Sequence, residues 1–78
     1  MSPRLPLVSG RETVAALERV GYRAVRQKGS HVRMRHPHPA QHKPLTVPMH
    51  RELRPGLLRA IVRDAGLTPD EFRELLGR

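Results

Sequence analysis

The chain has 78 residues and no cysteine, so it can form one small domain but neither a disulfide nor a thiolate zinc site. Its formal net charge is +8, and one tyrosine and one phenylalanine supply its only aromatic rings. The charge favours a polyanionic partner. The shortage of aromatic rings argues against RRM and OB-fold domains, which stack bases on such rings.

The distribution of charge is more informative than its sum. All seven acidic residues lie outside the stretch from Arg19 to Arg51, which holds eight Lys and Arg and all five histidines. A nucleic acid is therefore the expected partner. No apolar run approaches the ~18 residues of a membrane span, and residues 1–10 lack the apolar stretch of a signal peptide. We expect a cytoplasmic protein without a membrane partner.

The first predicted helix follows an irregular lead-in over residues 1–8. Ser9 and Glu12 have the spacing of a capping box, in which each side chain binds the backbone amide of the other. The helix is expected over residues 10–20, and Gly21 is a natural stop. Its buried stripe, at helical spacing, is predicted to consist of Thr13, Val14, Ala16, Leu17 and Val20.

A hairpin is predicted next, with strands over residues 22–27 and 30–36. Lys28 and Gly29 form the expected two-residue turn, because glycine adopts positive φ without a Cβ penalty. Gln27 would then pair with Ser30 across the turn.

This pairing fixes the two faces of the predicted sheet. Arg26 comes to lie opposite His31 and Val25 opposite Val32, and directly opposed residues share a sheet face. The residues expected to point inward are Val25, Val32 and Met34. Those expected to point outward, into solvent, are Arg26, His31, Arg33 and Arg35.

The second half of the chain predicts one short strand and two helices. Residues 37–43 are too rich in proline for regular structure, and residues 45–47 form a strand clipped by proline at both ends. Pro55 fits the first turn of a helix that Gly66 stops, with an apolar face of Leu57, Leu58, Ile61 and Val62. Thr68 and Glu71 repeat the capping-box spacing. They start a short helix that carries Phe72, Leu75 and Leu76 and ends at Gly77.

The order of these elements predicts an α+β domain with two layers. A three-stranded antiparallel sheet carries the helices on one face. The apolar residues suffice for that face alone, so the other face should be wet and basic.

Three stretches of the chain carry a resemblance. Residues 26–31 read Arg-Gln-Lys-Gly-Ser-His, residues 45–50 read Leu-Thr-Val-Pro-Met-His, and residues 53–58 read Leu-Arg-Pro-Gly-Leu-Leu. With Gly-Tyr at 21–22 and Ala-Gly-Leu at 65–67, they resemble the HicA toxin family of type II toxin–antitoxin systems, from about Ser9 to Leu67.

The resemblance implies the double-stranded-RNA-binding-domain-like fold, α-β-β-β-α, here with a short C-terminal helix added. It implies one HicA-like domain over residues 1–78, with a core of about 9–67 and a helical extension at 68–78. It also implies an endoribonuclease that cleaves mRNA and that a HicB-type antitoxin neutralises. The family's catalytic histidine is the one in Gly-Ser-His, here His31.

The chemistry expected of His31 is proton transfer, because an imidazole titrates near neutrality. RNA supplies its own nucleophile, the 2′-hydroxyl, so no cofactor is expected and the product would be a 2′,3′-cyclic phosphate. Whether His31 acts as base or as acid stays open. His50 is a candidate second proton-transfer group or substrate contact; it could equally cap the following helix or contact the antitoxin.

The expected RNA contacts surround His31. Arginine can hold a phosphate through two parallel hydrogen bonds, and exposed backbone amides can add an anion-binding concavity. The predicted contacts are Arg26, Lys28, Gly29, Ser30, Arg33 and Arg35. A merely solvated strand face is the alternative interpretation.

Three further histidines, His36, His38 and His42, have a spacing that superficially suggests metal ligation. Carboxylates are absent nearby, and the prolines disfavour a preformed site. We therefore expect no metal and, instead, a flexible loop that contacts RNA.

Two other classes of function remain open on the sequence. The chain could be a non-catalytic RNA- or DNA-binding module in which His31 is only a contact. It could also be a basic protein that binds an acidic protein partner and no nucleic acid.

Overall fold

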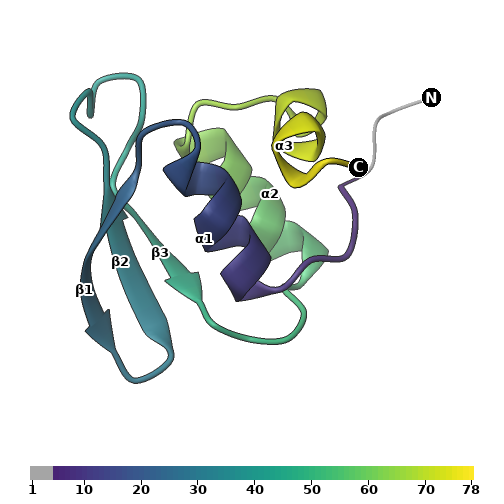
Figure 1. The fold of residues 1–78 in the computed structure, drawn as a ribbon, viewed down its shortest axis with the longest axis horizontal. Coiled ribbons are helices and arrows are strands. Elements are labelled where there is room, and N and C mark those ends of the chain that lie inside the picture. Colours follow the sequence, from purple (N-terminus) through teal and green to yellow (C-terminus); the bar gives the residue numbers. More distant parts are fainter. Residues whose placement is uncertain (1–4) are drawn as a thin grey trace.

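The helices and strands follow the predicted order in the computed structural model, which describes residues 5–78. They are α1 (Gly10–Glu18), β1 (Arg23–Lys28), β2 (His31–Arg35), β3 (Leu45–Pro48), α2 (Pro55–Asp64) and α3 (Pro69–Leu76). The strands form one antiparallel sheet in the order β1-β2-β3. All three helices lie on one side of it (Figure 1), which confirms the predicted α+β class.

Residues 5–8 are irregular, as predicted for the lead-in over residues 1–8, and residues 1–4 of that prediction lie outside the described residues. Among residues 5–78, no helix has the length and apolar character needed to cross a membrane.

Both predicted capping boxes are present. The Ser9 hydroxyl accepts a hydrogen bond from the Glu12 amide at 3.0 Å, and the Glu12 carboxylate accepts one from the Ser9 amide at 3.0 Å. Thr68 and Glu71 repeat the arrangement at the start of α3, at 3.1 and 2.8 Å. Because these bonds satisfy amides that have no partner within the helix, the residue pattern alone places both helix starts.

The hairpin turn lies one residue later than predicted. Lys28 pairs with His31 and Gln27 with Val32, so the turn consists of Gly29 and Ser30, and the predicted pairing of Gln27 with Ser30 is wrong. Gly29 has φ +59° while the described non-glycine residues all have negative φ. This is the pattern of a type II′ turn, which takes glycine at its first central position; the predicted turn would have put Lys28 there.

A β-bulge interrupts β1, the strand that leads into that turn. The pairing shifts between Ala24 and Arg26, which leaves Val25 as the extra residue, with 53% of its surface exposed. The prediction that Val25 points into the core is therefore wrong. An unbroken ladder would have set Val25 opposite Met34, whereas the bulge lets Ala24 take that place and puts Arg23 opposite Arg35.

The core lies between the sheet and the helices. Its largest fully buried members are Val8, Leu17, Tyr22, Met34, Val47, Leu53, Leu58, Val62 and Phe72. The inward strand residues are as predicted apart from Val25, but Val14 and Val20 of the first stripe are only partly buried. Leu57 is 40% exposed, contrary to prediction, because it lies at the edge of the stripe that Leu58, Ile61 and Val62 form. Phe72 brings α3 into the same core.

The loop between β2 and β3 closes this core over Tyr22. The rings of His36 and His42 lie with their centroids 4.0 Å apart, and the Tyr22 ring meets each at a steep angle. A nitrogen of His36 lies 2.8 Å from the Val20 carbonyl oxygen, and one of His42 lies 2.6 Å from that of Ala65. Carbonyls that follow α1 and α2 thus gain partners. These two histidines are therefore held against the helices, whereas His38 is exposed, and the expected contact of the loop with RNA stays a prediction.

Tyr22 gives a prediction for alkaline pH. Burial, with a contribution from the negative charge of Asp64, raises the pKa of Tyr22 to about 12. An unfolded tyrosine ionises near pH 10, whereas the folded protein keeps Tyr22 protonated up to about pH 12. The free energy of unfolding is therefore unaffected by Tyr22 below pH 10 and falls by about 1.4 kcal/mol per pH unit as the pH rises from 10 towards 12. Tyr22 is the only tyrosine and there is no tryptophan, so ultraviolet absorbance reports this one site. We expect tyrosinate to appear together with unfolding; titration near pH 10 in a folded protein would contradict the assignment.

Candidate functional site

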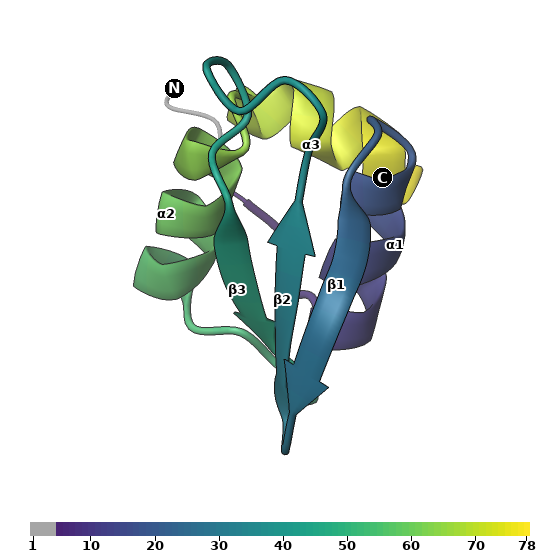
Figure 2. The same ribbon diagram turned by 90° about the vertical axis from the view of Figure 1, so that its left-hand side faces the viewer.

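The predicted site residues lie on the face of the sheet that turns away from the helices (Figure 2). Val32 and Met34 of β2 point into the core, so the residues that alternate with them point outward. Their cross-strand partners share this face. We call the surface the outer sheet face and define it by Arg23, Arg26, Lys28, His31, Arg33, Arg35 and Thr46.

His31 begins β2 directly after the turn, and its side chain is exposed. Its cross-strand neighbours are Lys28 on β1 and Pro48 on β3, in place of the predicted Arg26. The consequence of the corrected register is that a lysine, and not an arginine, stands directly opposite the imidazole. Gly29 and Ser30 form the adjoining turn and are also exposed, so their predicted role as anion contacts stays a prediction.

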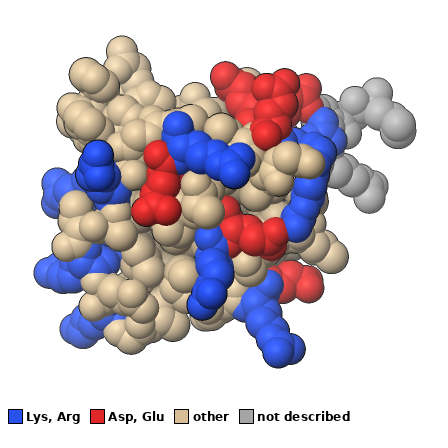
Figure 3. Space-filling view, viewed as in Figure 1, with Lys and Arg blue, Asp and Glu red and all other residues tan. Residues whose placement is uncertain are grey.

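Cations oppose cations across this face. Arg26 pairs with Arg33 and Arg23 with Arg35, although like charges directly opposite each other destabilise a sheet. Within residues 5–78 the ion pairs all lie elsewhere: Arg63 with Asp64, Arg73 with Asp70, and Arg78 with Glu12. Figure 3 shows Lys and Arg without Asp or Glu at the left edge, over the strands, whereas over the helices the two charges are mixed. The positive charge of the outer sheet face is thus left for a ligand to neutralise.

His50 is held at the same end of the sheet as His31. It follows Pro48, the partner of His31, by two residues, and the Met49 amide donates to the Ser30 carbonyl at 2.6 Å. The His50 carbonyl accepts from the Gly10 amide at 2.9 Å, and its side chain is exposed. The alternative that His50 caps α2 is wrong, because the N-cap of α2 is Arg54, with no side-chain hydrogen bond.

Two residues of the outer sheet face, Arg23 and Thr46, were not predicted from the sequence. Arg23 reaches it through the bulge, which no local pattern announces. Thr46 lies opposite Arg33, whose Nη1 donates to the threonine hydroxyl oxygen at 3.2 Å. Alternation with Leu45 and Val47 could have placed Thr46 outward, but its partner depends on the order of the strands.

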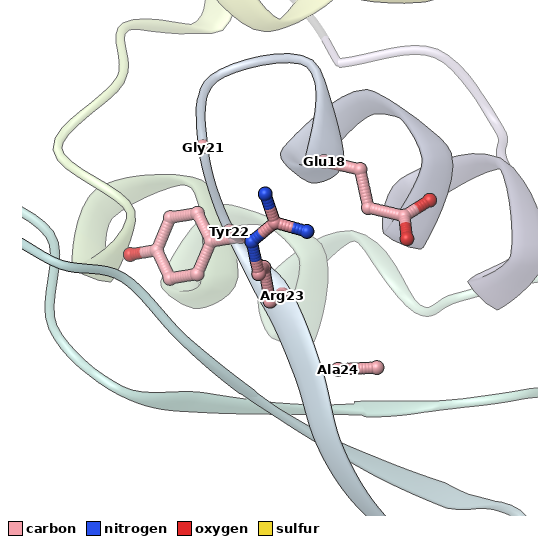
Figure 4. A pocket seen from close by; sticks show the side chains of 5 residues that line it. All are labelled: Glu18, Gly21, Tyr22, Arg23 and Ala24. Carbon is pink, nitrogen blue, oxygen red and sulfur yellow. The ribbon is translucent and has the colours of Figure 1, made fainter.

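A surface hollow lies away from these residues, where α1 runs into β1. It has a volume of ≈ 290 Å³ and is lined by Glu18, Gly21, Tyr22, Arg23 and Ala24. In Figure 4 the Tyr22 ring points away from Glu18 and Arg23, so the hollow is open surface without a converging set of polar groups. A polymer that lies along a sheet needs no deep pocket. The outer sheet face, with its cations and His31, is therefore a better candidate site than this hollow.

Two of the three loop histidines use their rings to bind the protein's own backbone. His36 and His42 bind backbone carbonyls, and the amide of His38 donates to Nδ1 of His36 at 3.0 Å. In the part of the chain from residue 5 onward, no three His, Asp or Glu side chains are grouped as a metal would need.

These features define a small α+β domain whose sheet presents a cation-rich face with an exposed imidazole at one end. Residues 10–67 match the model of a protein family described as the HicA toxin of bacterial toxin–antitoxin systems. The match covers more than half of the chain, which therefore belongs to the HicA toxin family. None of the curated proteins gives a significant match. The order of elements from α1 to α2 agrees with the double-stranded-RNA-binding-domain-like fold that the resemblance implied.

Proposed function

We propose that this toxin is a metal-independent endoribonuclease that cleaves mRNA, with His31 as its catalytic residue. The observation that carries the proposal is the position of His31: an exposed imidazole at the end of a sheet face on which Arg26 opposes Arg33 and Arg23 opposes Arg35. Such a face favours a polyanion, and the imidazole adds proton transfer to binding. Membership of the HicA toxin family supports the same function.

The reaction uses the ribose as nucleophile. The 2′-hydroxyl attacks the adjacent phosphorus, the bond to the 5′-oxygen of the next nucleotide breaks, and the products are a 2′,3′-cyclic phosphate and a 5′-hydroxyl. One proton leaves the 2′-oxygen and one reaches the 5′-oxygen, and His31 performs one of these transfers. His50 is the candidate for the other, or for a substrate contact. Lys28, opposite His31, and the arginines beside it stabilise the charge of the phosphorane.

The partner proposed for this toxin is a HicB-type antitoxin, which keeps the nuclease silent in the cytoplasm. An acidic protein suits the unpaired positive charge of the outer sheet face. A gene for a small acidic protein directly beside this one would support the pairing.

A non-catalytic binding module is the second candidate. The opposed arginines favour binding of an anion, but they do not by themselves imply catalysis. The deciding experiment incubates the protein with single-stranded RNA and with DNA of the same sequence, in the presence of EDTA. Cleavage of RNA alone supports the nuclease. Retention of RNA without cleavage selects the binding module, and no binding of either selects a protein partner.

RNA binding should follow the charge of the sheet and not that of the helices. Each phosphate contact on a single strand steepens the slope of log affinity against log salt by about 0.7. The Arg26→Gln/Arg35→Gln double variant should therefore flatten that slope by about 1.4 and weaken binding at low salt, as measured by fluorescence anisotropy. The matched control is Arg59→Gln/Arg63→Gln, which removes the same charge from exposed positions of α2. An equal effect of the control would show that binding does not use the outer sheet face.

A further inference from the structure

Arg33 differs from the other cations of the sheet. It lies on the central strand and is partly buried, whereas Arg23, Arg26, Lys28 and Arg35 are exposed. Among the lysines and arginines of the strands, within residues 5–78, only Arg33 has a side-chain hydrogen bond, to Thr46. Its long side chain is thus ordered before any ligand arrives, and such preorganisation lowers the entropy cost of binding.

The bond between Arg33 and Thr46 leaves most of the donors of the guanidinium free. A guanidinium has five N–H groups, and this contact uses one nitrogen's proton. The threonine hydroxyl accepts in this bond and so fixes the position of the guanidinium. The N–H groups that remain free on Arg33 suit the oxygens of one phosphate.

The surroundings of this pair call for an anion. Arg26 stands directly opposite Arg33 on the other side from Thr46. The two guanidinium groups repel each other, and no acidic residue lies on any of the three strands. A phosphate between them would offset this repulsion.

The position of the pair relates it to His31. Arg33 follows His31 by two residues on the same strand and points to the same face, which separates the two along β2 by roughly 6.8 Å. His31 lies in the cross-strand row of Lys28, His31 and Pro48. Arg33 lies in the next row that faces the same side of the sheet, which consists of Arg26, Arg33 and Thr46.

We propose that Arg33 and Thr46 form a subsite for the phosphodiester next to the one at His31. Thr46 is a positioning residue: it holds the guanidinium of Arg33 towards the RNA backbone. The subsite rests on the proposed function for its substrate, single-stranded RNA. It requires a substrate with at least two consecutive phosphodiesters, so KM should rise when a cleavable RNA is trimmed to one.

The test is a double-mutant cycle on binding, in a His31→Ala background so that the RNA stays intact. The probe is a fluorescent oligouridylate of several nucleotides, and affinity is read by anisotropy. Thr46→Val keeps the shape and β-branching of the side chain but removes the hydroxyl, and should weaken binding by about tenfold. Thr46→Ser should restore binding to within about twofold. In an Arg33→Gln background, Thr46→Val should change affinity by less than about twofold, because the bond it removes is already gone.

Several outcomes would overturn the subsite. Unchanged affinity of the Thr46→Val variant would do so, as would a full tenfold loss in the Arg33→Gln background. A loss that Thr46→Ser fails to restore would show that Thr46 supports only the strand. The result is independent of cleavage: a wild-type protein that binds but does not cut RNA removes the nuclease, and the cycle still decides the subsite.

Discussion

The His31→Ala variant is expected to lose about 10²–10⁴-fold of the rate of RNA cleavage, the usual contribution of a positioned acid or base. Its fold and its affinity for RNA should be retained. His31 is exposed at the start of β2, so truncation leaves no buried cavity, and surface substitutions of this kind change stability by about 0.5 kcal/mol or less. Single-turnover cleavage, thermal unfolding and anisotropy with labelled RNA measure the three properties separately.

The chain offers a matched control in His38, another exposed histidine. His38→Ala makes the same chemical change away from the outer sheet face and should leave cleavage unchanged. Cells should also express the His31→Ala variant more readily than the wild type when no antitoxin is present. Full activity in His31→Ala, or an equal loss in His38→Ala, would remove His31 from the mechanism.

The Gly10→Ala variant is expected to lose about 1–3 kcal/mol of folding free energy, the usual cost of overpacking. A Cβ on Gly10, the first residue of α1, would overlap the carbonyl oxygen of Pro48 and lie 2.8 Å from the Cα of Met49. Both neighbours are backbone, so the clash cannot be relieved by rotating a side chain. Because Pro48 is the partner of His31 and the Gly10 amide binds the His50 carbonyl, cleavage should fall as well.

Gly56→Ala is the control for this prediction. Gly56 lies in the first turn of α2, and a Cβ at this position would meet open space, with no packed neighbour within 4 Å. The same substitution there should be neutral or should stabilise the protein by about 0.4–1 kcal/mol, because alanine restricts the unfolded chain. Chemical denaturation of both variants measures the contrast. Equal stabilities would show that α1 does not press on the end of β3.

The features predicted correctly from the sequence are those that depend on residues close together in the chain. Each capping box is a bond between residues three apart, so Ser9 with Glu12 and Thr68 with Glu71 could be recognised from spacing alone. The inward positions of Val32 and Met34 follow in the same way from the alternation of a strand. These elements suffice to place His31 on an exposed sheet face.

The predictions from the sequence were wrong where the position of the turn and the pairing of the strands depend on more than a few neighbouring residues. The turn uses Gly29 in its first position and not its second, which moved the partner of His31 from Arg26 to Lys28. The bulge at Val25 then moves the pairing back by one residue, and this alone explains why Arg23 joins the site.

Residues distant in the chain set two further features. Thr46 meets Arg33 only because β3 pairs with β2. His36 and His42 reach the carbonyls of Val20 and Ala65 only once the helices are packed. Contacts of this kind leave no periodic signal in the sequence, so the loop could not be told from a flexible one.

The chemical ends of the RNA fragments test the central claim most directly. After incubation of the wild-type protein with a short single-stranded RNA in EDTA, mass spectrometry of the products identifies both new termini. Attack by the 2′-hydroxyl predicts a 2′,3′-cyclic phosphate on one fragment and a 5′-hydroxyl on the other, and no cleavage when the RNA is 2′-O-methylated. Fragments with a 3′-hydroxyl and a 5′-phosphate, or cleavage of the methylated RNA, would contradict a ribose nucleophile served by His31.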